Sequence, residues 1–233
     1  MTNLKVRERY SSEASLSCFC LFPVVPFAIP VAATADTVRV SLIEDSAVSA
    51  PARHGFDKLK AALAARGIGY EEISEPAAAK GQTLIVAGLP SNGGAAANRL
   101  EALHLSVSSR PESLLIHKTI WNGKVLLLLS GADPRGLLYS LLEVAHRIGW
   151  AGTPANPLSE VHDTAESPLV PDRGVTIFTM QQAQFEDRLH DEKYWARYFD
   201  TLAKDRFNRF PSALRLRNGR LYVPCLSIFW RYS

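Results

Sequence analysis

Cysteine is scarce in this sequence and absent from its middle. The three cysteines are Cys18, Cys20 and Cys225, so none lies between residues 21 and 224. The middle of the chain therefore needs no disulfide, and the six histidines show no metal-type spacing with cysteine. Neither His-Glu-x-x-His nor Gly-x-Ser-x-Gly occurs, so the signatures of zinc proteases and of α/β-hydrolases are missing. We expect no metal site and no cofactor.

A complete phosphate-binding loop is also lacking. The segment Gly131-Ala-Asp-Pro-Arg-Gly136 has the outer glycine spacing of such a loop. Leu137 and Leu138 follow it, however, where a lysine and a serine or threonine are required. The glycines from Gly88 to Gly94 do not have dinucleotide-binding spacing either. A nucleotide cofactor is therefore not expected.

The sequence has little excess charge, and what it has lies at the two ends. The formal net charge is +3, of which residues 211–233 contribute four arginines with no acid. Residues 1–35 add a net charge of +1, which leaves residues 36–210 slightly acidic. A nucleic-acid-binding protein would gather its basic residues on one folded face. We expect no nucleic-acid partner.

The one long apolar run lies near the N-terminus, from Leu16 to Ala33, after a basic start. Ala33-Thr34-Ala35 fits the small-x-small pattern of a signal-peptide cleavage site. Three prolines interrupt the run, and a membrane-spanning helix needs about 20 apolar residues, so we expect no stable membrane span. We interpret residues 1–35 as a cleaved export signal, which predicts a secreted or periplasmic protein. The alternative is an apolar N-terminus produced by a misplaced start site.

Residues 36–149 have the pattern of an α/β domain. Apolar and polar residues alternate from Val38, and a helical stripe over residues 53–66 ends at Gly67, where a left-handed C-cap is expected. Asn122-Gly123 separates two β-rich runs and predicts a hairpin, and Asp133 with Pro134 predicts the start of a helix. The element order predicts an α/β sandwich, with a mixed sheet and helices on one face.

The segment that follows the hairpin reads Ser130-Gly-Ala-Asp-Pro-Arg-Gly-Leu-Leu-Tyr139. It resembles the turn into the last helix of the non-catalytic α/β domain in hexosaminidase-type (family 20) and α-glucuronidase-type (family 67) glycoside hydrolases. In those enzymes this domain precedes a TIM barrel. Ser140 replaces the usual glycine of the pattern. Within this turn the matching residues are Asp133, Arg135, Gly136 and Tyr139. The resemblance as a whole covers about residues 100–210 and includes the segment from Phe185 to Phe210, which looks like the first barrel helix and the entry to the second strand.

Residues 150–172 contain four prolines and are expected to form an irregular connector. After it, the sequence predicts a strand at Val175–Met180 and an amphipathic helix that begins after Asp191. Only 61 residues remain from Arg173 to Ser233, whereas a TIM barrel needs about 250. We therefore expect residues 173–210 to be an incomplete first βα unit of a TIM barrel in a truncated chain.

Arg173 is the single candidate substrate-binding residue. An Arg-Gly pair begins the first barrel strand of the hydrolases that this chain resembles, and the resemblance implies that the arginine binds sugar hydroxyls. A guanidinium can hold two vicinal hydroxyls with paired donors. The alternative is a structural salt bridge.

The polar residues after the expected strand could also bind sugar, or form a solvated loop; they are Gln181, Gln182, Gln184, Glu186 and Asp187. Glycoside cleavage normally needs two groups placed across the scissile bond. Glu186 and Asp187 are adjacent and would point apart on an extended chain, so we do not nominate them as such a pair. The resemblance implies that the catalytic acids lie on later barrel strands, to which no residue here corresponds, so we expect no catalytic residue in this chain.

Residues 211–233 differ in composition, because arginine is their only charged residue type. We expect an irregular tail from a shifted reading frame, or alternatively a short hairpin around Asn218-Gly219. The sequence thus predicts the N-terminal portion of an exported glycoside hydrolase that acts on oligo- or polysaccharides and is itself inactive. The alternatives are a non-enzymatic module that binds carbohydrate or a partner protein, and a non-functional product of a disrupted reading frame.

Overall fold

A computed structural model describes residues 38–45, 49–152, 156, 158–175 and 191–210, together with the backbone of three short strands after them. The expected export signal at residues 1–35 lies outside the described residues. The polar residues Gln181, Gln182, Gln184, Glu186 and Asp187 also lie outside them. Among the described residues, no helix is long and apolar enough to cross a membrane.

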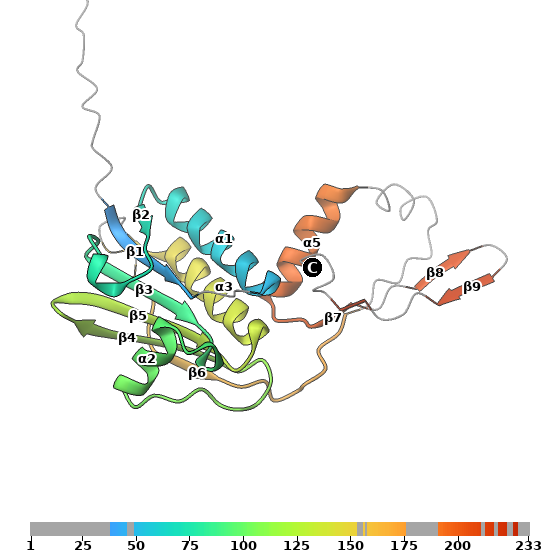
Figure 1. Ribbon diagram of the computed structural model, residues 1–233. Coiled ribbons are helices and arrows are strands. Elements are labelled where there is room, and N and C mark those ends of the chain that lie inside the picture. Colours follow the sequence, from blue (N-terminus) through green and yellow to red (C-terminus); the bar gives the residue numbers. More distant parts are fainter. Residues whose placement is uncertain are drawn as a thin grey trace, which may run out of the picture. The chain divides into compact units, whose positions relative to one another are not determined.

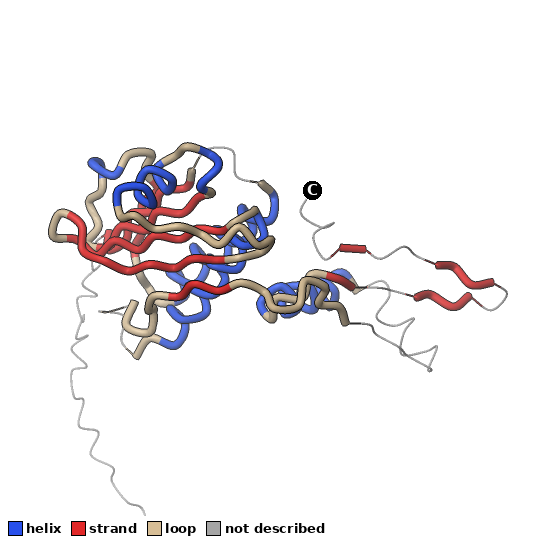
Figure 2. Tube along the Cα trace, turned by 90° about the horizontal axis from the view of Figure 1, so that it is seen from below, coloured by secondary structure: helices blue, strands red, loops and turns tan. Residues whose placement is uncertain are grey.

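A six-stranded mixed sheet forms the centre of the fold (Figures 1 and 2). Its strand order is β2-β1-β3-β5-β4-β6; β2, β1, β3 and β5 are parallel, and β4 pairs antiparallel with both β5 and β6. The central strands are continuous apolar runs because both of their faces are buried. The strands are β1 (Val38–Glu44), β2 (Gly69–Glu72), β3 (Thr83–Gly88), β4 (Leu114–Trp121), β5 (Lys124–Gly131) and β6 (Thr164–Glu166).

Helices α1 (Ala50–Ala65) and α3 (Pro134–Trp150) pack side by side on one face of the sheet (Figure 1). The short helix α2 (Ala95–Ala102) packs on the other face. The α/β class and the mixed sheet are confirmed, but the expectation of helices on one face is corrected by α2. Its Ala96 and Leu100 cover Val86 and neighbouring strand residues, which would otherwise face water. Two single-turn 3₁₀ helices, Pro76–Ala78 and Pro90–Asn92, lie in the connections.

The local signals in the sequence have the expected geometry. Gly67 has φ +64° and ends α1 in a Schellman motif, in which the Ile68 amide donates to the Leu63 carbonyl at 3.0 Å. Asn122 and Gly123 have φ +49° and +76°, as a type I′ hairpin turn requires. The Asp133 carboxylate caps α3 by accepting the amides of Arg135 and Gly136 at 3.0 and 2.9 Å.

Beyond the sheet, α5 (Glu192–Lys204) leads into β7 (Arg209–Phe210). The Asp191 carboxylate caps α5, as expected, by accepting the Tyr194 amide at 2.9 Å. Gly174 bridges Arg209 in parallel, and the Val175 amide donates to the Arg209 carbonyl at 3.2 Å. Parallel pairing across an intervening helix is the arrangement of a βαβ unit. Apart from Val175, the expected strand Val175–Met180 lies outside the described residues.

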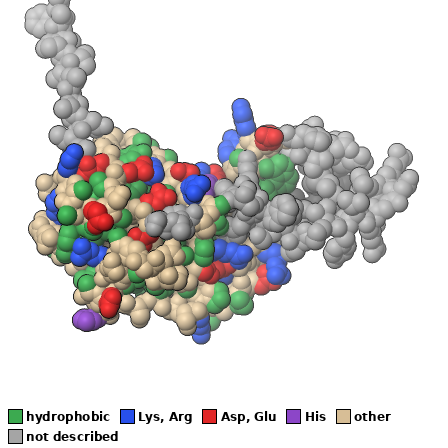
Figure 3. Space-filling model, viewed as in Figure 1, with side chains coloured by type: hydrophobic (Ala, Val, Ile, Leu, Met, Phe, Trp, Pro, Cys, Tyr) green, Lys and Arg blue, Asp and Glu red, His purple; other side chains and the backbone are tan. Residues whose placement is uncertain are grey.

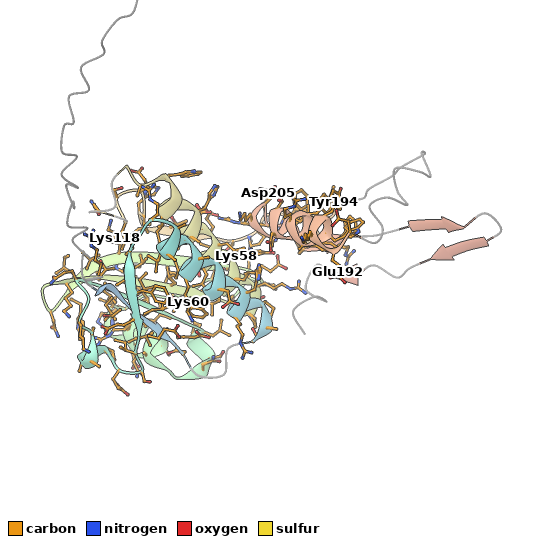
Figure 4. The ribbon with its side chains drawn as sticks, turned by 90° about the horizontal axis from the view of Figure 1, so that it is seen from above. Lys58, Lys60, Lys118, Glu192, Tyr194 and Asp205 are labelled. Carbon is orange, nitrogen blue, oxygen red and sulfur yellow. The ribbon has the colours of Figure 1, made fainter. Side chains whose placement is uncertain are left out.

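Helix α5 shares its core with the sandwich. Leu202, Ala203 and Phe210 belong to the same buried cluster as the residues of α1 and α3. Lys58 of α1 donates a hydrogen bond to Asp200 of α5 at 2.6 Å. Figure 4 labels Lys58, Glu192 at the start of α5 and Asp205 just after its end. One buried cluster therefore includes residues on both sides of the expected boundary near residue 149, and the boundary itself stays a prediction.

Two expected irregular segments contain strands. The connector at 150–172 contributes β6, which extends the sheet beside β4. The segment 211–233 contains β8 (Ala213–Leu216), β9 (Gly219–Tyr222) and β10 (Leu226–Ser227). β8 and β9 pair antiparallel, in the manner of the alternative hairpin, and β10 pairs with β7.

Candidate functional site

Glu112 lies at the centre of a polar junction between the sandwich and the segment that follows it. Its side chain is only 5% exposed and its φ is +62°, a left-handed conformation that is uncommon outside glycine. The carboxylate accepts hydrogen bonds from Arg135 at 2.8 Å, from Arg173, and from the Asn208 amide at 3.1 and 3.2 Å. A strained backbone persists only where its surroundings over-determine it, and these contacts do so.

The junction keeps Glu112 ionised. Burial alone would raise the pKa of its carboxyl group, but hydrogen bonds from Arg135, Asn208 and Arg173, together with the charge of Arg173, outweigh that effect. The pKa of Glu112 therefore lies below its ordinary value. Tyr139 lies nearby, and burial together with the negative charge of Glu112 raises the pKa of its phenol to about 12. The junction thus holds a charged carboxylate next to a neutral tyrosine at physiological pH.

The four residues that carry the family resemblance surround the Glu112 turn. Asp133 uses one carboxylate oxygen to cap α3 and the other to accept the Glu112 amide at 2.9 Å. Arg135 pairs with the Glu112 carboxylate. Position 136 requires glycine, because a Cβ there would overlap the carbonyl oxygen of Ser113. The motif therefore positions the 112–113 turn against the start of α3.

Arg173, the candidate substrate-binding residue, lies in this junction. Its Nε donates to the Arg206 carbonyl at 2.7 Å and one Nη donates to the Val170 carbonyl at 2.8 Å. The other Nη pairs with the Glu112 carboxylate. The guanidinium is thus engaged by all three nitrogens, although it still lines a surface pocket. Its role as a sugar ligand stays a prediction.

Asn208 connects three parts of the junction. Its side-chain oxygen accepts the Arg173 amide at 2.9 Å, and its side-chain nitrogen donates to the Pro171 carbonyl at 2.7 Å as well as to Glu112. Its backbone amide donates to the Arg173 carbonyl at 2.9 Å. One side chain therefore fixes the connector, the first residue of the βαβ unit and the sandwich to one another.

The junction forms the floor of a pocket with a volume of about 730 Å³. Ligand pockets typically have volumes of roughly 300–1,000 Å³. Four arginines line this pocket, from the 110–112 turn, the start of α3, position 173 and β7. Its lining residues are Arg110, Pro111, Glu112, Arg135, Pro168, Leu169, Pro171, Asp172, Arg173, Asn208 and Arg209.

A second hollow of about 630 Å³ lies at the carboxyl end of β1, next to the start of α2. The buried Asp45 carboxylate accepts hydrogen bonds from the first amides of this helix, from Ala95 at 2.8 Å and from Ala96 at 3.2 Å. A Cβ on Gly88 or Gly94 would overlap that carboxylate. These glycines thus make room for Asp45 and not for a phosphate.

Sequence reasoning singled out Arg173 but missed Glu112, Arg110 and Arg209. An acid between a proline and a strand is indistinguishable in sequence from a solvated turn residue. Its burial and its positive φ mark Glu112 as unusual, and both are properties of the fold. No group of three or more histidine, cysteine or acidic side chains suited to a metal ion occurs among the described residues.

The comparisons with known proteins show solved structures that share the fold of this chain, but they assign the chain to no family. No family model matches the sequence, and no curated protein matches it. Among solved structures, the chain is similar to a GH138 enzyme targeting pectin rhamnogalacturonan II, with a TM-score of 0.53 and 16% identity. It is also similar to BtGH115A, a 4-O-methyl-α-glucuronidase with specificity for decorated arabinogalactans, with a TM-score of 0.53 and 17% identity. A third similar structure is CpGH84D, with a TM-score of 0.51 and 11% identity.

These matches cover 75%, 75% and 81% of this chain but only 24%, 25% and 36% of the three solved chains. The chain therefore spans about a quarter of the length of the first two. Three quarters of 233 residues is about 175, so the match to each necessarily includes residues beyond Glu166. The likeness thus takes in part of the segment after the six-stranded sheet.

Proposed function

We propose that this chain is the N-terminal portion of an exported glycoside hydrolase that acts on oligo- or polysaccharides, and that it is inactive by itself. One observation carries the proposal: three glycoside-hydrolase structures share the fold of this chain, and the shared part extends past the sandwich. The parallel bridge between Gly174 and Arg209 across α5 supports a βαβ unit at that place. In this proposal Arg173 contacts the sugar.

The role of the sandwich in this proposal is to hold the first βα unit. Glu112, Arg173 and Asn208 join the two parts through buried and partly buried polar contacts. Catalysis would require an acid and a second group across the scissile bond, and residues later in a barrel would supply them. Residues 1–233 then contribute stability and part of a binding surface.

The test is a hydrolysis assay with the purified full chain. We expect no release of sugar from chromogenic hexosaminides or uronides, because no catalytic pair is assigned to this chain. Measurable turnover, abolished by mutation of an acid within the chain, would contradict the inactive-fragment part of the proposal. An Arg173→Gln variant that binds glycans as well as the original chain would remove Arg173 from the proposed sugar contacts.

The nucleotide sequence after the Phe210 codon gives a second test. Reading it in the other two frames should reveal further alternating strand and helix patterns, if the βαβ unit is the start of a barrel. Absence of such patterns in every frame would favour a non-enzymatic module that binds carbohydrate or a partner protein. The arginine-lined pocket is the observation that supports that second candidate.

A further inference from the structure

The pocket above the Glu112 junction carries excess positive charge. Both of its carboxylates already have arginine partners, because Glu112 pairs with two arginines and Asp172 pairs with a third. The charged lining residues are Arg110, Arg135, Arg173, Arg209, Glu112 and Asp172, which gives a net charge of +2.

Arg110 is the residue whose charge is not compensated. Its guanidinium makes no hydrogen bond or ion pair with any residue that the structure describes. Its backbone, in contrast, is fixed: the Arg110 carbonyl accepts the hydroxyl of Ser113 at 2.7 Å and the Ser113 amide at 3.2 Å. A rigid turn therefore presents a cation at the pocket wall, two residues before Glu112.

We infer that this pocket binds the carboxylate or sulfate group of an acidic oligosaccharide, with Arg110 as the main contact. A guanidinium offers paired donors that match the oxygens of a carboxylate or a sulfate. Arg135 and Arg209, whose side chains are 39% and 52% exposed, line the same space and add to its positive potential. The saccharide part of this inference rests on the proposed function, whereas the anionic part rests on the charges of the pocket.

The lining argues against a single-stranded nucleic acid as the ligand. Proteins that bind single-stranded nucleic acids stack the bases on aromatic side chains. The described residues that line this pocket include no aromatic side chain; its apolar walls are Pro111, Pro168, Leu169 and Pro171. On the face shown in Figure 3, acidic and basic side chains are interspersed and do not form a basic stripe.

The experiment compares the binding of matched charged and neutral ligands to the purified full chain by titration calorimetry. The probes are an oligogalacturonate, the same oligomer as its neutral methyl ester, a chondroitin sulfate tetrasaccharide and a single-stranded oligonucleotide. The variants are Arg110→Gln and, as a matched control, Arg53→Gln, which removes an exposed arginine of α1 outside the pocket. Circular dichroism of each variant checks that the fold is retained.

We expect the chain to bind the uronate or the sulfated oligomer and not the methyl ester. Loss of a charge-assisted hydrogen bond in Arg110→Gln should weaken binding by about tenfold or more, and Arg53→Gln should leave it unchanged. Added salt should also weaken binding, because exposed charges are screened.

Equal binding of the acid and its ester would overturn the inference, as would equal affinities of Arg110→Gln and the original chain. Oligonucleotide binding that depends on Arg110, without saccharide binding, would show that the ligand class is wrong. Binding of neutral glycans alone would overturn this inference and leave the proposed function standing. Failure to bind any saccharide would overturn the inference and count against the carbohydrate part of the proposed function as well.

Discussion

Replacement of Glu112 by glutamine tests whether the polar junction holds the two parts of the chain together. The substitution keeps the size of the side chain and the left-handed backbone, so the backbone strain is the same in both proteins and cancels from the comparison. It removes the negative charge that Arg135 and Arg173 share. It also replaces one acceptor oxygen with an amide nitrogen, so one arginine faces a donor.

The expected cost follows from the contacts. A hydrogen bond to a charged group contributes about 1.5–3 kcal/mol, and breaking a fully buried ion pair costs about 3–5 kcal/mol. Arg135 and Arg173 are 39% and 21% exposed, so water can solvate them in part after the change, and the cost falls toward the lower range. We expect Glu112→Gln to lower the free energy of unfolding by about 2–3 kcal/mol.

The assay is urea unfolding of the full chain at pH 7, followed by circular dichroism. The matched control is Glu166→Gln, because Glu166 is 46% exposed and pairs with Arg206 at the edge of the sheet. An exposed pair of that kind contributes about 1 kcal/mol or less. If Glu112→Gln costs no more than Glu166→Gln, the junction does not stabilise the fold and the reasoning fails.

The pH dependence of the unfolding free energy tests whether the ionised carboxylate of Glu112 is the source of this stability. The pKa of Glu112 is lowered in the folded chain, whereas the unfolded chain has a value near 4.5. Its contribution to stability is therefore fully present above pH 4.5 and is lost as the pH falls through the lower, folded value. The stability difference between the original chain and Glu112→Gln should shrink below pH 4.5. A difference that stays constant down to pH 2 would show that the ionised carboxylate is not its source.

Three further predictions concern residues around the junction and the core. Asn208→Asp places a second carboxylate next to Glu112, and the two negative charges repel each other. This substitution should therefore lower the hydrogen-exchange protection of residues 191–210 more than Asn208→Ala does. A larger loss of protection in Asn208→Ala would refute this argument. Gly136→Ala should lower the free energy of unfolding by about 1–3 kcal/mol in thermal unfolding, because the added Cβ would overlap the Ser113 carbonyl. Its control in the same helix is Gly149→Ala, which has open space around it and should raise the free energy of unfolding by about 0.5–1 kcal/mol. Equal effects of the two substitutions would contradict the close packing at Gly136. Asp200→Asn removes the negative charge that pairs with Lys58 and His54 but keeps a side-chain oxygen that can accept their hydrogen bonds, so it should cost only about 1 kcal/mol or less in urea unfolding. A larger cost would mean that the contact between α1 and α5 is primarily electrostatic.

The sequence predicted the elements whose causes are local. Gly67, Asn122-Gly123 and the caps at Asp133 and Asp191 each depend on a few neighbouring residues, and each has its expected geometry. The face that α2 covers could not be predicted in the same way. It depends on which side of the sheet α1 and α3 leave uncovered, and only the completed sheet determines that.

The candidate site was harder to predict for the same reason. Glu112, Arg173 and Asn208 are separated by up to 96 residues, and their contacts depend on how the connector returns to the start of β4. β6 is only three residues long and carries no periodic signal, yet its pairing with β4 brings the connector to that place. Arg173 was identified only through a family resemblance, which gave its position in the chain but none of its partners.

The arrangement around Glu112 gives a physical reason for the Asp-x-Arg-Gly-x-x-Tyr pattern. Capping of α3 requires only Asp133, and close packing against Ser113 requires only Gly136. Neither requirement explains Arg135, whose guanidinium pairs with one carboxylate oxygen of Glu112 while Arg173 pairs with the other. A sandwich that ended at α3 would leave Glu112 with one arginine and a strained backbone, at a cost of about 1–3 kcal/mol. The pattern therefore makes physical sense when a following segment supplies Arg173 and Asn208, and it predicts such a segment better than it predicts a catalytic site.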